Sequence, residues 1–234
     1  MTERVILACT DPSARGRSTV DWAEEEARLH GLTMRAVVGS PPDPAPAGTI
    51  VCGIPGDAGA SGRPPGSRVP SAAVASDRPL VLVPDGFPSA PPRRSREVLL
   101  GVDARDPSGG AIGFAFESAR VRGVRLHAVH AWSLPPRAAE WPFGVPEEER
   151  GEWEDQEVQL LADALRPWRG KYPEVPVLED VLLFAPADAL LHHAGGAGLI
   201  VVGRRPGAGW GRVVRALLRG TPCPVAVVPA RPAP

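Results

Sequence analysis

Glycines follow a short apolar run in the first part of the chain, in a pattern suited to holding phosphate. The run Thr49–Cys52 predicts a strand, Gly53 and Gly56 come directly after it, and Gly66 and Ser67 close the loop after nine further residues. Glycine lets the backbone turn with positive φ and approach an anion closely. A helix starting near Ser67 would add free N–H groups and the positive end of its dipole. The stretch predicts a phosphate-binding loop, with a glycine- and proline-rich surface loop as the alternative.

An altered copy of this loop lies near the end of the chain. Gly203 again follows an apolar run, but Pro206 occupies the position of the second glycine, and the spacer before Gly211 is about five residues shorter. Proline has no N–H donor and a fixed φ, so it substitutes poorly for glycine in a phosphate loop. The closing serine is replaced by Arg212. The arginines of this copy could still attract an anion: Arg204, Arg205 and Arg212.

Other residue types that carry chemistry are not arranged for it. His127 and His130 are three apart on a predicted strand and should face opposite sides, and His192 and His193 are adjacent on a predicted helix. We expect surface or packing roles for these histidines and no metal site. The chain has neither a dinucleotide fingerprint nor a P-loop lysine, and no nucleophile is paired with a base in its sequence pattern. The sequence therefore predicts a protein without catalytic activity.

The composition narrows the function classes further. The 234 residues carry a net charge of -1, which shows no bias toward nucleic acid or an anionic membrane surface. Cys9, Cys52 and Cys223 lie in apolar runs and predict buried free thiols in a reducing compartment. The N-terminus lacks the apolar segment of a signal peptide, and no apolar run approaches the roughly 18 residues of a spanning helix. We expect a cytoplasmic protein with no nucleic-acid or membrane partner.

The elements that would position the loops alternate between strand and helix, which favours a parallel sheet with right-handed crossovers. In the first part, strands are predicted at 4–10, 33–38, 49–52 and 80–83, with a helix at 17–30 and a short helix that starts near Ser67 and is broken near Pro70. From residue 97 the alternation is more regular, with strands at 98–103, 124–132, 175–184, 199–203 and 224–228. The helices between them are predicted at 109–121, 147–171, 186–193 and 212–219.

The two parts align with each other, as an internal duplication would. Asp11-Pro12-Ser13 corresponds to Asp106-Pro107-Ser108, and IVCGIPG and RPLVLVP correspond to IVVGRRP and CPVAVVP. The first copy lacks the equivalents of one long helix, one strand and one further helix. We predict two lobes, a shortened one over 1–84 and a complete one over 97–230, joined by a proline-stiffened basic linker over 85–96.

The second lobe resembles the universal stress protein family. The similarity rests on VLLGVDARDPS, VRLHAVHAW, APADALLHHAGGAGLIVVG and TPCPVAVVP, which span residues 97–229, and the shorter copy extends it over most of 1–84. The spacing G-x2-G-x9-G-[ST] that starts at Gly53 also matches the family's nucleotide loop. The resemblance implies an α/β fold with a doubly wound parallel sheet of five strands, order 3-2-1-4-5, in the second lobe and a truncated copy in the first. It also implies frequent dimers, and ATP binding in one branch of the family.

The resemblance further implies which residues would bind the nucleotide. In the family, the aspartate after strand 1 contacts the adenine or ribose, the end of strand 2 supports the base, and the glycine loop holds the phosphates. The corresponding site in the first lobe consists of Asp11, Val37, Gly53, Gly56, Gly66 and Ser67. A second, degenerate site in the other lobe consists of Asp103, Val129, Gly203, Gly211 and Arg212. Because only the first lobe has the intact loop, we expect the nucleotide there. A helix-capping role for the two aspartates is the alternative.

Together these features predict a stress-response regulatory protein that binds ATP without catalysis. The alternatives are an interaction module of the same family without a nucleotide, and a slow ATP-hydrolysing relative on the same fold. The last strands of the two lobes, 80–83 and 225–228, should be sheet edges, and we expect them to pair within one chain as a pseudo-dimer, with a homodimer as the alternative. Strand 33–38 should also be an edge, covered by Pro41–Pro46 or by neighbouring chain.

Overall fold

The computed structural model describes residues 5–10, 17–39, 47–55, 69–88, 97–140, 144–205 and 209–230. The first part contains β1 (Val5–Thr10), α1 (Arg17–His30), β2 (Thr33–Val38), β3 (Ala47–Ile54), α2 (Ser71–Ala75) and β4 (Leu80–Pro84). The second part contains β5 (Glu97–Val102), α3 (Gly109–Arg122), β6 (Leu126–Trp132), α4 (Glu147–Lys171), β7 (Val177–Leu183), α5 (Pro186–His193), β8 (Ala197–Arg204), α6 (Arg212–Gly220) and β9 (Val225–Pro229). Short 3-10 turns occur at Pro136–Glu140 and Ala194–Gly196.

Local signals explain where several helices begin and end. The side chain of Ser108 caps α3 by accepting a hydrogen bond from the Ala111 N–H at 3.4 Å. The glycines that follow α1 and α3, Gly31 and Gly123, both have a φ of 63°, a conformation that glycine adopts without steric cost. The long helix α4 starts with three glutamates, which suit the positive end of its dipole. No helix within the described residues is both long enough and apolar enough to cross a membrane.

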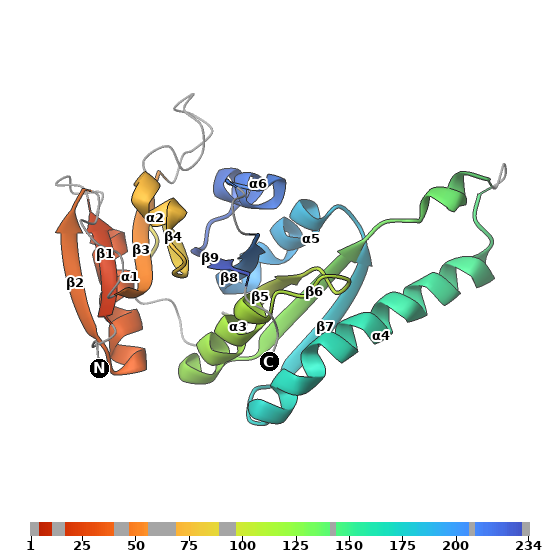
Figure 1. The fold of residues 1–234 in the computed structure, drawn as a ribbon, viewed down its shortest axis with the longest axis horizontal. Coiled ribbons are helices and arrows are strands. Elements are labelled where there is room, and N and C mark those ends of the chain that lie inside the picture. Colours follow the sequence, from red (N-terminus) through yellow and green to blue (C-terminus); the bar gives the residue numbers. More distant parts are fainter. Residues whose placement is uncertain are drawn as a thin grey trace.

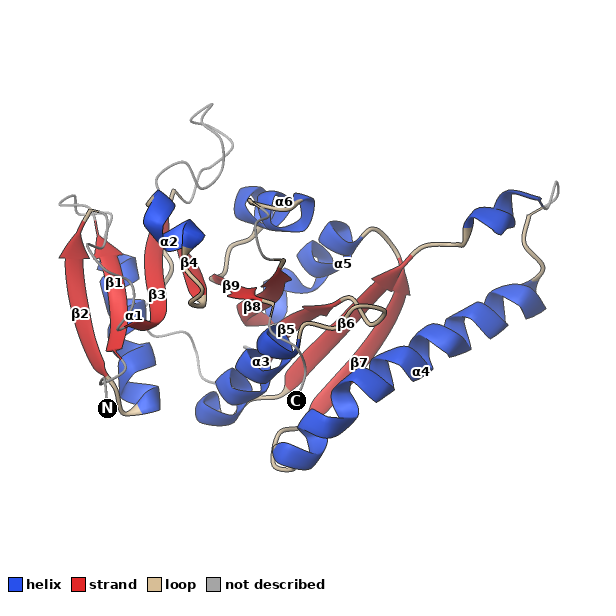
Figure 2. Cartoon of the chain, viewed as in Figure 1, coloured by secondary structure: helices blue, strands red, loops and turns tan. Residues whose placement is uncertain are grey.

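All nine strands form one sheet in the order β2-β1-β3-β4-β9-β8-β5-β6-β7, as Figure 1 shows. Every neighbouring pair is parallel except β4 and β9. The last five strands, numbered 1 to 5 along the chain, lie in the order 3-2-1-4-5. Helices α3 and α4 pack on one face of this part, and α5 and α6 pack together on the other (Figure 2). The fold is thus an α/β fold with an open, mostly parallel sheet.

The antiparallel pair β4 and β9 joins the two parts of the chain. Leu80 lies opposite Val227, and Leu82 lies opposite Val225. These four side chains are at most 3% exposed, so the junction is continuous with the hydrophobic core. The pairing expected for the two last strands is therefore present. The strands of the two parts run in opposite directions because the pair is antiparallel. The carboxyl ends of β1 to β4 therefore lie at one end of the strands in the sheet, and the carboxyl ends of β5 to β9 lie at the other.

Two local features of the first part differ from the sequence prediction or go beyond it. Helix α2 begins at Ser71, after Pro70, and not near Ser67. The reason is that proline disfavours helical conformation in the residue that precedes it, here Val69, but fits well at a helix start. β2 is an edge strand, as expected, and Val38 at its end is 69% exposed. The predicted cover of this edge, Pro41–Pro46, lies outside the described residues.

A buried ion pair links the helices of the two parts. Glu26 on α1 is 2% exposed, and its carboxylate pairs with the guanidinium of Arg122 on α3. The second carboxylate oxygen lies 3.2 Å from Nε2 of His30. Burial alone would raise the pKa of the Glu26 carboxyl, but Arg122 and His30 outweigh it and hold that pKa below its ordinary value. The charged form of Glu26 is therefore the form that stabilises the fold.

The variant Glu26→Gln should lower the free energy of unfolding at pH 7 by about 1–3 kcal/mol, because it leaves Arg122 without its charged partner. A carboxyl whose pKa is depressed on folding stabilises the protein above its unfolded pKa, and this contribution is lost as the pH falls through the folded value. The difference between wild type and variant should therefore shrink below about pH 4.5, the ordinary pKa of the group. Urea unfolding at pH 7 and at lower pH measures it.

A matched control is Glu25→Gln, since Glu25 pairs with Arg28 on the surface, where the two side chains are 46% and 64% exposed. Exposed pairs contribute about 0–1 kcal/mol, so this variant should stay close to wild type. An equal loss for both variants, or a loss for Glu26→Gln that does not change with pH, would contradict the role given to the buried pair.

Candidate functional site

A large cavity lies at the carboxyl ends of β5, β6 and β8. It has a volume of about 1240 Å³ and is closed at its sides by residues of α3, α5 and α6. In open α/β sheets, ligands bind outside the carboxyl ends of the strands, where the strand order reverses. Here that point lies between β5 and β8. The cavity wall includes all five residues predicted for the second lobe: Asp103, Val129, Gly203, Gly211 and Arg212.

Asp103 follows β5 directly and presents a half-exposed carboxylate at the rim of this cavity. Its Oδ1 accepts a hydrogen bond from the backbone N–H of Arg105 at 3.3 Å. Its Oδ2 lies 3.7 Å from the guanidinium of Arg205, which also pairs with Asp106 at 2.9 Å. The capping alternative for Asp103 is wrong, because Ser108 caps α3. The carboxylate is thus held by a turn and by an exposed ion pair, and one side of it remains open to the cavity.

The glycines that line the cavity differ in whether packing requires the absence of a side chain. A Cβ added to Gly203 would lie 2.9 Å from the Cβ of Ser108, so the absence of a side chain is required by the packing of α3 against β8. A Cβ on Gly209 or Gly211 would meet no atom of a described residue within 4 Å. At these two positions the missing side chain leaves the backbone before α6 open toward the cavity. Gly203 is therefore explained by packing, whereas Gly209 and Gly211 are not.

The variant Gly203→Ala should destabilise the protein by about 1–3 kcal/mol, because the new methyl group would force α3 away from β8. Gly211→Ala is the matched control. Gly211 has φ -63° and ψ 168°, which alanine also adopts, and its loss of stability should stay within about 0.5 kcal/mol. Denaturant unfolding of the two variants measures the difference. Equal stabilities would show that β8 and α3 do not need the close approach.

Three arginines near this cavity have different partners. Arg204 donates hydrogen bonds to the backbone oxygens of Val74 and Ser76, the second at 2.7 Å, and so satisfies carbonyls at the end of α2. Arg205 is paired with two aspartates, as described above. Arg212 starts α6 and forms no ion pair with any described residue. Of the three arginines expected to attract an anion, Arg204 is therefore committed to the junction, and Arg212 is placed to meet a ligand.

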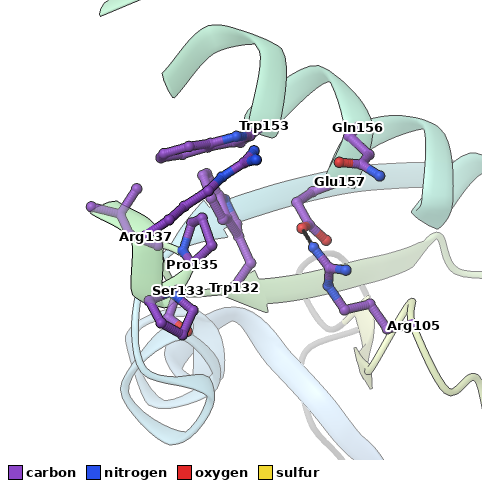
Figure 3. Close-up of a pocket in the computed structure, with 10 residues that line it drawn as sticks. Arg105, Trp132, Ser133, Pro135, Arg137, Trp153, Gln156 and Glu157 are labelled. Atoms are coloured by element: carbon purple, nitrogen blue, oxygen red, sulfur yellow. Dashed lines mark hydrogen bonds and ion pairs between the residues drawn. The ribbon is translucent and has the colours of Figure 1, made fainter. Parts of the chain in front are cut away.

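A buried network fixes the loop that carries Asp103. His130, at 2% exposure, places Nε2 2.9 Å from Oε2 of Glu157, a residue of α4 that is 1% exposed. The other oxygen of Glu157 pairs with Arg105 (Figure 3). Because a carboxylate only accepts hydrogen bonds, Nε2 of His130 carries a hydrogen. Nδ1 of the same ring lies 3.3 Å from the backbone nitrogen of Ala104. The two residues that follow Asp103 are thus tied to α4, Ala104 through His130 and Arg105 directly through Glu157.

A smaller cavity of about 430 Å³ adjoins the larger one and shares Arg105, Trp132, Ser133 and Leu134 with it. Figure 3 shows the guanidinium of Arg137 against the ring of Trp153, and the distance from Arg137 Cζ to the ring centroid is 4.9 Å. Cation–π contacts of this kind order an otherwise mobile side chain. Sequence patterns gave no signal for this cavity or for Glu157, because the contacts join residues from distant elements.

Only part of the site predicted for the first lobe can be compared with the structure. Asp11, Gly56, Gly66 and Ser67 lie outside the described residues. Val37 is half-buried on the edge strand β2, and a Cβ on Gly53 would lie 2.6 Å from Oγ1 of Thr19 on α1. Packing therefore explains the glycine at 53 as it explains the one at 203, because a Cβ at either position would collide with a neighbouring side chain. Both described positions lie toward the end of the strands that is opposite the large cavity, so the two predicted sites could not share one ligand.

The sequence of the chain is similar to a protein-family model and to proteins of known sequence. The model of the universal stress protein family matches residues 95–229. Universal stress protein Rv1996 of Mycobacterium tuberculosis is 35% identical over 193 residues, which cover 79% of this chain and 60% of that protein. Rv2623, a universal stress protein of the same organism, is 34% identical over 157 residues, covering 64% of this chain and 50% of that protein. The chain thus spans about half to 60% of the length of these relatives.

A solved structure shows the same fold. The crystal structure of a universal stress protein from Archaeoglobus fulgidus superposes with a TM-score of 0.63. The match covers 97% of this chain and 96% of that chain at 14% sequence identity.

Proposed function

The chain belongs to the universal stress protein family, and on that premise we propose that its large cavity binds an adenine nucleotide, with ATP as the expected ligand. The observation that carries the proposal is the gathering of Asp103, Val129, Gly203, Gly211 and Arg212 around one cavity. We propose a regulatory role in the stress response, without catalysis. The proposal moves the preferred site from the first lobe to the second, because only this set comes together within the described residues.

The wall near β5 and β6 suits the base and the ribose. Val129, in the middle of β6, is 2% exposed and contributes an apolar side chain to the cavity wall. The carboxylate of Asp103 at the rim can accept hydrogen bonds from ribose hydroxyls or from an exocyclic amine. Its ion pair with Arg205 is exposed on both sides, and such pairs contribute only about 0–1 kcal/mol. A ligand could therefore take the place of Arg205 at small cost.

The opposite wall suits the phosphates. The first-turn N–H groups of a helix have no intrahelical acceptor, and the nine-residue helix α6 has no side-chain cap at Gly211. Arg212 adds a positive charge at the same end of the helix, and an added Cβ at Gly209 or Gly211 would contact none of the described residues. An anion at this position would meet N–H donors, a helix dipole and a guanidinium together.

We further propose that residues 1–84 and 97–230 are two lobes of a tandem protein. In support, the order β2-β1-β3-β4 corresponds to positions 2-1-4-5 of the second part, with the third strand missing. The antiparallel contact between β4 and β9 relates the two parts as the subunits of a dimer would be related. The site predicted around Gly53 and Gly56 remains a prediction for the first lobe.

Calorimetric titration with ATP tests the proposed site. The variant Asp103→Ala should weaken binding about 10- to 100-fold, because it removes a charge-assisted hydrogen bond of about 1.5–3 kcal/mol. Gly56→Pro, which changes the loop of the first lobe, should bind like wild type. If Gly56→Pro abolishes binding and Asp103→Ala does not, the site lies in the first lobe.

Two further outcomes separate the alternatives. A wild-type chain that does not bind ATP, dAMP or AMP at millimolar concentration would favour the interaction module. Phosphate release from ATP that Asp103→Ala abolishes would favour the hydrolysing relative.

A further inference from the structure

Three side chains with metal-ligating atoms converge on the face of the sheet that α5 covers. His127 lies on β6, Asp180 on the neighbouring strand β7, and His193 at the end of α5. Nε2 of His127 is 2.6 Å from Oδ2 of Asp180, and Nε2 of His193 is 4.0 Å from the same oxygen. One ligand atom from each residue lies within 4.8 Å of the other two. The two imidazole rings meet edge to face, with centroids 4.7 Å apart.

We propose that His127, Asp180 and His193 form a binding site for a divalent transition-metal ion, with Zn²⁺ as the expected occupant. Two imidazoles and one carboxylate are a ligand set that Zn²⁺ takes in proteins, with a water completing four-coordination. With bonds of about 2.0–2.1 Å, ligand atoms of a tetrahedral site lie roughly 3.3 Å apart. The distances of 2.6 Å and 4.0 Å in the ion-free protein lie on either side of this value. Small rotations of Asp180 and His193 would equalise them.

A carboxylate contacts the second ring nitrogen of His127, the one that faces away from Asp180. Nδ1 of His127 lies 2.9 Å from Oε1 of Glu97, and Oε2 of Glu97 accepts from Nε of Arg125 at 2.5 Å. Metal-ligating histidines typically donate their other ring N–H to such a carboxylate, which fixes the tautomer and the ring orientation. Glu97 thus occupies Nδ1 of His127, while Nε2 of the same ring faces Asp180.

The exposure of the three side chains suits a site that an ion can enter. The side chain of His127 is 4% exposed, while those of Asp180 and His193 are 33% and 24% exposed. The two members from the sheet are thus His127, which is buried, and Asp180, which together with His193 from α5 lies toward solvent.

Each ring nitrogen of His127 has its own carboxylate partner, Glu97 at Nδ1 and Asp180 at Nε2. Coordination of an ion through Nε2 would leave the contact between Nδ1 and Glu97 in place.

This inference is independent of the proposed nucleotide site. None of the three residues lines the large cavity, which lies at the carboxyl ends of the strands. A failure of ATP binding would leave the metal site untouched, and a failure of metal binding would leave the cavity untouched.

Titration of the untagged, chelator-treated full chain with ZnCl₂ in a calorimeter tests the proposal. We expect one saturable site per chain and a higher melting temperature with Zn²⁺ than without it. The variants His193→Gln and Asp180→Asn should each weaken binding at least tenfold, and Glu97→Gln should weaken it by about 10- to 100-fold through the orientation of His127. His192→Gln is the matched control, because His192 is the exposed neighbour of His193 on the same helix and is not one of the three ligands.

Co²⁺ provides a second readout that does not depend on stability. Bound in place of Zn²⁺, it should give visible absorption bands of a four- or five-coordinate site, and these should be lost in His193→Gln and kept in His192→Gln. The proposal is overturned if the wild-type chain shows no saturable Zn²⁺ binding, or if His193→Gln binds as well as wild type. It is equally overturned if His192→Gln loses as much affinity as His193→Gln.

Discussion

The antiparallel pairing of β4 with β9 is the constraint on which the rest of this structure depends. It converts two sets of parallel strands into one sheet and buries the apolar edges that each set would otherwise expose. It also reverses the strand direction at the junction, so ligand sites at the carboxyl ends of the strands must lie on opposite sides of the molecule for the two parts. The Arg204 guanidinium, bonded to the last carbonyls of α2, and the buried pair Glu26–Arg122 add polar contacts on either side of this junction. Both bring groups from the two parts together, so the parts stabilise each other.

The same junction limits the chemistry of the large cavity. Arg204 is the last residue of β8, and its side chain bonds to the neighbouring part of the chain, while Arg205 is held by Asp103 and Asp106. The positive charge left for a ligand therefore lies at the start of α6. Gly203 is fixed by the approach of α3, so its presence alone is no sign of phosphate binding. The open backbone at Gly209 and Gly211 and the carboxylate of Asp103 are the features that packing does not explain.

Sequence reasoning recovered the elements and the positions at strand ends, because both follow from local physics. The bounds of α1, α4 and α5 agree with the helical periodicity and the capping residues. Asp103 and Gly203 were named as site residues from the resemblance to the universal stress protein family. The start of α2 was placed too early, since Ser67 looked like a cap while Pro70 determined the first turn. The networks around His130 and His127 could not be predicted. Each depends on which face of a strand meets a distant helix, and Glu157, Asp180 and His193 are far from them in sequence.

We propose that the cavity at the carboxyl ends of β5, β6 and β8 binds an adenine nucleotide, and a crystal structure of the chain grown with saturating ATP would test this. We expect nucleotide density inside this cavity, with the sugar near Asp103 and the phosphates at the first turn of α6 beside Arg212. Nucleotide density at the glycine loop after β3, with the large cavity free of it, would show that the site lies in the first lobe.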